Sequence, residues 1–330
     1  PSVSQPASQQ VCTGSSTNTV AFDGTVVNTV YNWTNSLSSI GIPTSGTGDI
    51  LTFNPINNGN DIDTAVITVT PVFQGCPGTP RHFNFVVMPF ADLNQPLNQF
   101  VCNGQQTSAV NFNGTVSGTS FIWTNNNSSI GLASSGNGSV PAFTTQNNSN
   151  VSQTALITVA ASANNCPGNT RTFEIHVDPT PGMSQTSSIS VCNGTRVDSL
   201  VFNGTVAGTS FSWINSNSSI GLSANGNGSI PTFVATNTSN QTQSATISVT
   251  GMANSCNSVA SNFTITVYPA AAIDSIPDQQ ICNGSRMQSI SLSSPVAGSG
   301  FRWVNDNPTV GLAASGTGEI GRAHVLNSSH

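Results

Sequence analysis

Short segments in which apolar and polar residues alternate dominate the chain. In "TAVITVT" (64–70), Ala65, Ile67 and Val69 share one face and the polar threonines share the other. The same alternation recurs in "TALITVA", "SATISVT", "FNFVV", "FEIHV" and "FTITV". A period of two is typical of half-buried β-strands. Segments rich in Gly, Asn and Pro separate these strands, and no stretch combines helical periodicity with caps. The pattern therefore predicts an all-β protein.

The alternating segments recur with a period of 90 residues. No gap is needed to align the first three copies, and words such as "VCNG" and "SSIGL" return in register. The step is obeyed by two series of cysteines (12, 102, 192 and 282; 76, 166 and 256), by four tryptophans (33, 123, 213 and 303) and by three prolines (89, 179 and 269). We therefore expect repeat 1 at 1–90, repeat 2 at 91–180, repeat 3 at 181–270 and a truncated repeat 4 at 271–319.

Each repeat has room for about seven short strands, with turn signals every 8–12 residues. This organisation predicts tandem immunoglobulin-like antiparallel β-sandwiches. Pro89, Pro179 and Pro269 close the last predicted strand of each copy and begin short linkers. We therefore expect the sandwiches to form an extended array.

Each tryptophan follows an aromatic residue by two positions, so the two side chains share a strand face. We expect the tryptophans to be core residues: Trp33, Trp123, Trp213 and Trp303. The preceding aromatics are candidate ligand-binding residues, but core packing is the favoured interpretation for them too: Tyr31, Phe121, Phe211 and Phe301.

The last residues break the repeat. After "SGTGEI" the copies continue with "PAFTTQ" or "PTFVAT", whereas here the chain ends "GRAHVLNSSH". These letters match the translation of a common sequencing adapter with a one-base slip, so 320–330 is interpreted as an artefact of a truncated read. The alternative is a genuine divergent tail. The chain also lacks an initiator Met and a signal peptide, which favours a fragment of a longer protein.

The composition restricts the function further. Charged residues make up 5% of the 330 residues, the net charge is −6 and lysine is absent. Six arginines cannot supply the basic clusters that nucleic-acid binding needs, so no nucleic-acid partner is expected. No apolar run reaches the ~20 residues of a membrane helix, so no membrane insertion is expected in this fragment. The 16 Phe and 4 Trp argue for packed cores rather than disorder.

The two cysteines of each complete copy are 64 residues apart, without the clustered CxxC or CxxH pairs of zinc sites. We therefore expect one disulfide within each repeat and an oxidising compartment. The expected pairs are Cys12–Cys76, Cys102–Cys166 and Cys192–Cys256. Cys282 is expected to be unpaired, because its partner would lie near position 346. The alternative is a set of buried free thiols.

No catalytic constellation emerges from the sequence. His82 and His176 lie in or beside the last predicted strand of their copies, do not recur, and are interpreted as solvated strand residues. Asp61 and Asp63 could contact Ca²⁺, but only in repeat 1. The glycine pairs of "SGTG" and "SGNG" are interpreted as turns or bulges. We therefore expect no catalytic, cofactor-binding or metal site, no cofactor and no enzyme activity.

The block "WTNNNSSIGLASSGNGSVPAF", followed by "TALITV", "NNCPGNTRTF" and a closing V-x-P, resembles the PKD-like repeats of Bacteroidetes extracellular proteins. The resemblance covers 1–319. Repeat 3 departs from it with "SCNSVA", and repeat 4 has Leu292 where the other copies have Phe. The resemblance implies immunoglobulin-like sandwiches in large secreted or surface-anchored proteins, often exported by the type IX system, and it assigns no catalytic residues.

Two functions fit these observations. The first is a structural spacer or adhesin-type repeat region of a secreted or cell-surface protein. The alternative is a carbohydrate- or protein-binding accessory region of a secreted hydrolase whose catalytic domain lies elsewhere. In either case we expect an extracellular or cell-surface location, glycan or protein partners that bind through flanking modules, and no obligate oligomer.

Overall fold

The computed structural model describes residues 1–184 and 186–321. It contains two compact units, Pro1–Pro179 and Thr180–His330, which are described separately below. Most of the 320–330 segment that the sequence flagged, namely 322–330, lies outside the described residues. Repeats 1 and 2 fall in the first unit, and repeats 3 and 4 in the second.

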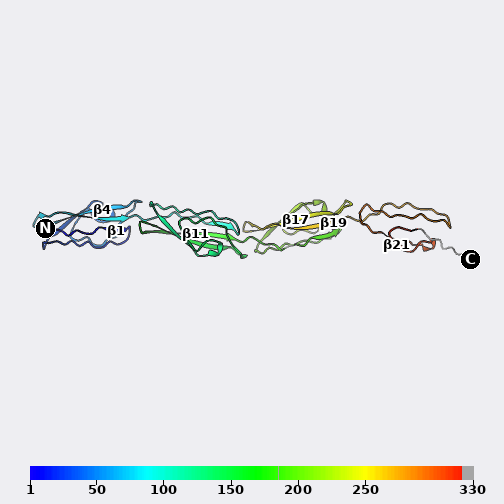
Figure 1. Ribbon diagram of the computed structural model, residues 1–330, viewed down its shortest axis with the longest axis horizontal. Coiled ribbons are helices and arrows are strands. Elements are labelled where there is room, and N and C mark those ends of the chain that lie inside the picture. Colours follow the sequence, from blue (N-terminus) through cyan, green and yellow to red (C-terminus); the bar gives the residue numbers. More distant parts are fainter. Residues whose placement is uncertain (185, 322–330) are drawn as a thin grey trace. The chain divides into compact units, whose positions relative to one another are not determined.

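Repeat 1 forms one sheet of six strands. Figure 1 labels two of them, β1 and β4, in the blue N-terminal part of the chain. The strand order is β1-β6-β4-β2-β3, with β5 added beside β4. The strands are β1 (Gln9–Cys12), β2 (Val30–Asn35), β3 (Ser45–Thr47), β4 (Asp63–Phe73), β5 (Cys76–Pro77) and β6 (Arg81–Met88).

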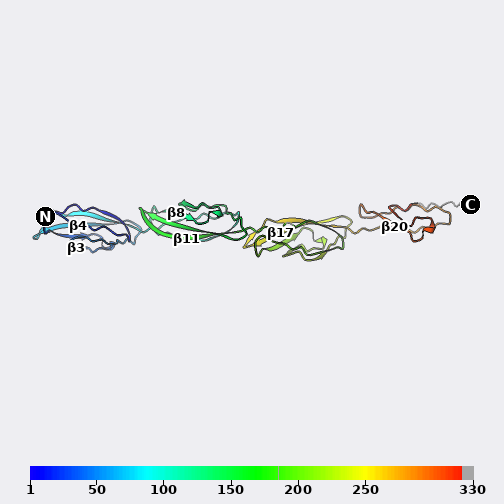
Figure 2. The same cartoon turned by 90° about the horizontal axis from the view of Figure 1, so that it is seen from below.

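Repeats 2 and 3 reproduce this sheet. The order is β7-β11-β10-β8-β9 in repeat 2, and β12-β19-β17-β14-β15 with β18 beside β17 in repeat 3. Repeat 2 contains β7 (Gln99–Cys102), β8 (Ser120–Asn125), β9 (Ser135–Asn137), β10 (Gln153–Ala163) and β11 (Cys166–Asp178). Repeat 3 contains β12 (Ile189–Cys192), β13 (Arg196–Val197), β14 (Ser210–Asn215), β15 (Asn225–Asn227), β16 (Phe233–Val234), β17 (Gln243–Ala253), β18 (Cys256–Asn257) and β19 (Ser261–Tyr268). Figure 2 shows β8 and β11 in the same body of repeat 2, and β17 in repeat 3.

Repeat 4 retains only part of the pattern within the described residues. Strands β20 (Arg302–Val304) and β21 (Ser315–Thr317) pair with each other, as β2 pairs with β3. The helical segments in the described ranges are three-residue 3-10 turns, too short to span a bilayer. They are η1 (Ser38–Ile40), η2 (Ser128–Ile130), η3 (Ser218–Ile220) and η4 (Pro308–Val310).

The long central strand of each repeat supplies the core. In β4, Ala65, Ile67 and Val69 are fully buried, while Val66 and Thr68 between them lie on the opposite, more exposed face. The equivalent positions of β10 and β17 are also buried, and each repeat has its own hydrophobic cluster. The apolar residues of the alternating pattern therefore share one buried face of each sheet, because removing apolar surface from water is favourable.

The opposite layer of each sandwich is held by few ladder bonds. In repeat 3, β13 pairs with β16 in a two-stranded sheet. In repeats 1 and 2 the segments of this layer are connected by isolated antiparallel bridges, such as Val20 with Ile50 and Val110 with Val140. Their apolar side chains complete the core from the second side, as in a β-sandwich.

One strand pair in each repeat departs from the antiparallel arrangement that the sequence led us to expect. β1 runs parallel to β6, β7 parallel to β11, and β12 parallel to β19. The first strand enters the repeat and the last strand leaves it in the same direction, so they meet in parallel at the sheet edge. The long connection that a parallel pair requires is the rest of the repeat.

The tryptophan of each repeat lies against a glycine of the next strand. Trp33 pairs with Gly46, and Trp123 with Gly136. A Cβ on Gly46 would lie 2.1 Å from Cζ2 of Trp33, and one on Gly136 would lie 2.3 Å from Cζ2 of Trp123. The first glycine of "SGTG" therefore lies in a strand and makes room for the indole, rather than forming the turn or bulge we expected. The second glycine has a left-handed φ, +77° at Gly48.

A buried asparagine fastens the loop before each long strand. In repeat 2, Nδ2 of Asn147 donates to the carbonyl oxygens of Val151 and Val177, and its Oδ1 accepts from the backbone N–H of Ser149. Asn57 and Asn237 make the same three bonds in repeats 1 and 3. The asparagine side chain itself is buried, and its bond to the carbonyl of the last strand is buried as well, so this polar group depends on its protein partners.

Candidate functional site: the junction between repeats 1 and 2

The topology gives each repeat two distinct ends. The last strand of each repeat begins at one end of the sheet, next to the hairpin that follows the long central strand. In repeat 1 this hairpin contains β5, and in repeat 2 it leads directly into β11. We call this end of a repeat its entry end. The first strand and the last strand both finish at the opposite end, which we call the exit end. Cys12 closes β1 opposite Met88, so it lies at the exit end of repeat 1. Cys166 follows the β10–β11 turn, so it lies at the entry end of repeat 2.

These two cysteines are joined. The Cys12–Cys166 disulfide spans 154 residues of sequence, and its Cα atoms are 5.6 Å apart. This Cα separation is typical of a protein disulfide. The bond therefore connects the exit end of repeat 1 to the entry end of repeat 2.

The pairing within repeats that the spacing suggested is wrong. In repeat 1, Cys12 lies beside the β4 end that contains Asp63, whereas Cys76 pairs with Phe73 at the other end of β4. Because β4 has 11 residues and a strand rises ~3.3 Å per residue, Cys12 and Cys76 are separated by about 30 Å along the strand. A disulfide needs Cα atoms within ~7 Å. Cys12–Cys76 therefore cannot form.

The same geometry excludes the other two expected pairs. Cys102 lies opposite Asp178 at one end of β11, and Cys166 begins that 13-residue strand. Cys192 lies opposite Tyr268, whereas Cys256 pairs with Ala253 across the hairpin at the far end of β17. Neither Cys102–Cys166 nor Cys192–Cys256 is formed.

The remaining cysteines divide into two groups. Cys102 and Cys256 are each disulfide-bonded, and Cys256 follows Cys102 by the same 154 residues. Cys76, Cys192 and Cys282 are free and exposed in the described part of the chain.

A tight turn presents Cys166 at the junction. Asn164 and Asn165 connect β10 to β11 with φ of +52° and +62°. Two successive positive φ values are the mark of the type I′ hairpin, and Asn tolerates them better than most residues. Beside the disulfide is an open pocket of about 190 Å³ whose lining, drawn from both repeats, is Gln10, Val11, Cys12, Met88, Asn164, Asn165 and Cys166. Met88 is 5% exposed, so the junction covers the apolar exit end of repeat 1.

The predicted core aromatics pack inward. Trp33, Trp123 and Trp213 are buried and belong to the three clusters, and Trp303 is half-buried. The aromatics two positions earlier are half-buried as well, and three of them pack on a neighbouring phenylalanine, as Phe121 does on Phe112 with 5.7 Å between ring centroids. Burial raises the pKa of Tyr31, and the negative charge of Asp23 adds to this shift. None of these aromatics forms a free stacking platform.

The candidate polar residues do not converge. The ring of His176 stacks on Phe100, its Nδ1 lies 3.0 Å from Thr154, and its Nε2 lies 2.8 Å from Glu174. His82 bonds Thr68 on a neighbouring strand. Asp61 is exposed, and its carbonyl accepts a bond from Asn57.

Among the described residues, no three His, Cys, Asp or Glu side chains gather to hold a metal. Within the described residues, His82 and His176 each contact side chains of their own sheet.

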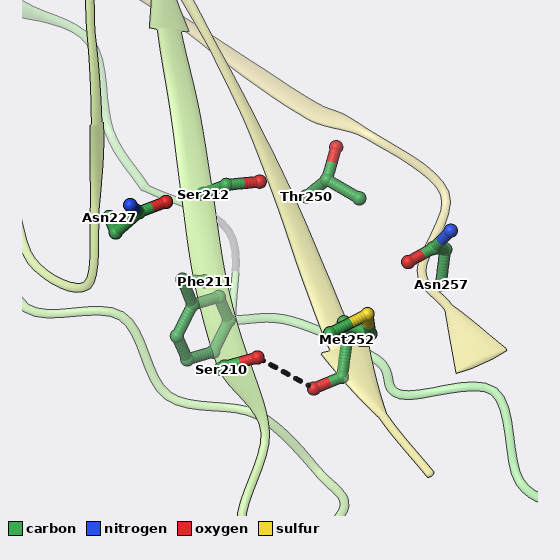
Figure 3. A pocket seen from close by; sticks show the side chains of 7 residues that line it. All are labelled: Ser210, Phe211, Ser212, Asn227, Thr250, Met252 and Asn257. Atoms are coloured by element: carbon green, nitrogen blue, oxygen red, sulfur yellow. Dashed lines mark hydrogen bonds between the residues drawn. The ribbon is translucent and has the colours of Figure 1, made fainter. Parts of the chain in front are cut away.

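A second open pocket lies on the outer face of repeat 3 (Figure 3). It is open, encloses about 310 Å³, and is lined by Ser210, Phe211, Ser212, Asn227, Thr250, Met252 and Asn257. Oγ of Ser210 donates to the backbone carbonyl of Met252, as the dashed line shows. The lining contains hydroxyls, amides, a phenyl ring and a thioether but no charged side chain. Ser210, Phe211 and Asn227 recur in repeat 2, whereas Ser212 corresponds to Asn32 in repeat 1 and to Ile122 in repeat 2.

Solved structures of other proteins resemble this chain in fold. No protein-family model matches this chain, and no curated protein sequence matches it. Three immunoglobulin domains of titin (I67–I69, an E-to-A variant) are 12% identical over 80% of this chain and 96% of that one, with a TM-score of 0.47. Mouse cadherin-23 EC22–24 is 12% identical over 81% and 96%, with a TM-score of 0.34. The ectodomain of human desmocollin-1 is 8% identical over 99% and 75%, with a TM-score of 0.28. Similarity at this level concerns the fold alone.

Proposed function

We propose that this chain is a non-catalytic spacer or adhesion-type region of a larger extracellular protein, built to keep its length under tension. The observation that carries the proposal is the disulfide between Cys12 of repeat 1 and Cys166 of repeat 2. A covalent bond that crosses from one repeat to the next changes how the chain transmits force.

Tension applied at the two chain ends passes through covalent bonds. With Cys12 joined to Cys166, the residues between them, 13–165, lie outside the force path. A bond within one repeat would shield only that repeat. The observed bond shields most of repeat 1 and most of repeat 2 together, and it limits the extension even if both unfold.

The chemistry of the bond supports an extracellular setting. Disulfides persist in oxidising compartments and are rare in the cytosol. Four of the seven cysteines are disulfide-bonded. The finer assignment, PKD-like repeats of a Bacteroidetes surface protein exported by the type IX system, is part of this proposal and rests on the sequence resemblance.

Each repeat in this proposal is a separate folding unit in an extended array. Three hydrophobic clusters, each confined to one 90-residue repeat, support this division.

Single-molecule stretching of the full chain tests the proposal. Cys102 is replaced by Ser in both proteins, so that the comparison reports on Cys12–Cys166 alone. The Cys12→Ser/Cys102→Ser protein should reach a fully unfolded length greater by roughly 500 Å than Cys102→Ser, because 154 residues re-enter the force path at ~3.3–3.6 Å each.

Cys76→Ser/Cys102→Ser is the matched control, since Cys76 is free. Its unfolded length should equal that of Cys102→Ser. Equal lengths for the Cys12 and Cys76 variants would contradict the proposal, because they would show that no bond at Cys12 shortens the force path.

The pocket on repeat 3 favours a second candidate, binding of a neutral oligosaccharide. Hydroxyl and amide groups beside two apolar side chains, Phe211 and Met252, suit an uncharged polyol, and the absence of charge in the lining disfavours anions. Heteronuclear NMR of the full chain titrated with neutral oligosaccharides should shift the signals of Ser212 and Asn227. The equivalent positions of repeat 2, Ile122 and Asn137, are the internal control and should not shift.

A further inference from the structure

Repeat 3 presents a second exit end built like that of repeat 1. Cys192 ends β12 opposite Tyr268, as Cys12 ends β1 opposite Met88, and both pairs are parallel. In repeat 1 the exit-end cysteine is bonded to the next repeat. In repeat 3, Cys192 is free and exposed.

The surroundings of Cys192 are uncovered as well. Met88, beside the bonded Cys12, is 5% exposed, whereas Tyr268, its counterpart beside Cys192, is 47% exposed. The side chain beside the exit-end cysteine is therefore buried where that cysteine forms a disulfide and exposed where the cysteine is free. This is a second observation, independent of the thiol, that a covering partner belongs at this end.

We propose that Cys192 is the attachment point for the entry-end hairpin of a following repeat of the same kind. The inference rests on the proposed function and extends it to a second junction. The partner is a two-residue turn followed by cysteine, as in Asn164–Asn165–Cys166. The 90-residue step places this cysteine at position 346, after the end of repeat 4's partial sequence. Cys76 has the complementary role, since it is the free entry-end thiol of repeat 1.

The bond forms by oxidation of two thiols. The thiolate of one cysteine attacks a disulfide supplied by an oxidoreductase or by oxidised glutathione, which gives a mixed disulfide and releases one thiolate. The second cysteine then attacks this mixed disulfide and displaces the other half. Two protons and two electrons leave the cysteines, and the reagent disulfide is reduced to two thiols.

The test is an extended chain. Residues 230–270 of repeat 3 are added after Glu319, which completes repeat 4 and places a cysteine at position 346. A second extended chain uses residues 140–180 of repeat 2, whose hairpin contains the turn of the observed bond. After refolding in a glutathione buffer and alkylation of free thiols, non-reducing peptide mapping identifies the bonds.

We expect Cys192 to be linked to the cysteine at position 346 in both extended chains, with Cys282 alkylated. In the Cys192→Ser control, the cysteine at position 346 should be alkylated. A bond between Cys282 and position 346, or alkylation of Cys192 in both chains, overturns the inference.

The same digest reports on Cys12 and Cys166. If Cys12–Cys166 is found while Cys192 is alkylated, the inference fails and the proposed function stands. If Cys12–Cys166 is also missing, the proposed function fails as well.

Discussion

At the scale of single residues, the repeats are held in register by contacts whose partners are far apart in sequence. The indole of Trp123 lies on Gly136 of the neighbouring strand, and the amide of Asn147 ties its loop to the carbonyl of Val177 at the end of β11. The tryptophan was predictable, because a large aromatic residue on an alternating strand belongs in a core. The asparagine was not, because a buried Asn and a solvated loop Asn are identical letters in a chain rich in Asn.

Replacing Gly136 with Ala should destabilise repeat 2 by about 1–3 kcal/mol. The new Cβ would lie 2.3 Å from Cζ2 of Trp123. The indole is buried and cannot move aside without disturbing the core. Amide hydrogen exchange of the full chain, followed by mass spectrometry, should show faster exchange in β8 and β10. The control is Ser135→Ala on the same strand, which is exposed; equal exchange in the two variants would disprove the packing role of Gly136.

Replacing Asn147 with Ala should cost about 1–3 kcal/mol, because buried backbone groups lose their partners. Asn147 is 5% exposed and makes three hydrogen bonds. Chemical denaturation of the full chain, monitored by hydrogen exchange in 147–153, measures the loss. The neighbouring Asn148 is exposed, so Asn148→Ala is the matched control and should leave the exchange unchanged. Similar protection in both variants would contradict the assigned role.

At the scale of elements, strands were predictable and their ends were not. The alternation in 64–70 predicted β4 because burial of every second side chain is a local property of the strand. The spacing of 64 residues between cysteines contains no information about which end of the sandwich each one occupies. The usable signal was the turn before each second cysteine, "QGC", "NNC" or "NSC", which places that cysteine at a hairpin tip. The parallel edge strand, which sends the first cysteine to the opposite end, leaves no comparable mark.

Asn165→Val should weaken the hairpin that presents Cys166. Asn165 has φ of +62°, which a β-branched residue adopts at a cost of about 1–2 kcal/mol. Equilibration of the full chain in glutathione buffers should then require more oxidising conditions to form Cys12–Cys166. Asn165→Gly is the control, because glycine adopts positive φ without strain, and it should behave like the unmodified protein. If Val and Gly variants oxidise at the same potential, the turn does not position the cysteine.

At the scale of the whole molecule, the repeat unit of the fold and the unit of covalent linkage differ. A fold repeat runs from its entry end to its exit end, whereas the disulfide begins in one repeat and ends in the next.

The central claim is that the disulfide crosses the boundary between repeats. Non-reducing peptide mapping of the oxidised full chain, with free thiols blocked before digestion, tests it most directly. The account predicts a peptide that contains Cys12 linked to one that contains Cys166, with Cys76 recovered in blocked form. A peptide that links Cys12 to Cys76 would contradict it, because the two ends of β4 would then have to meet.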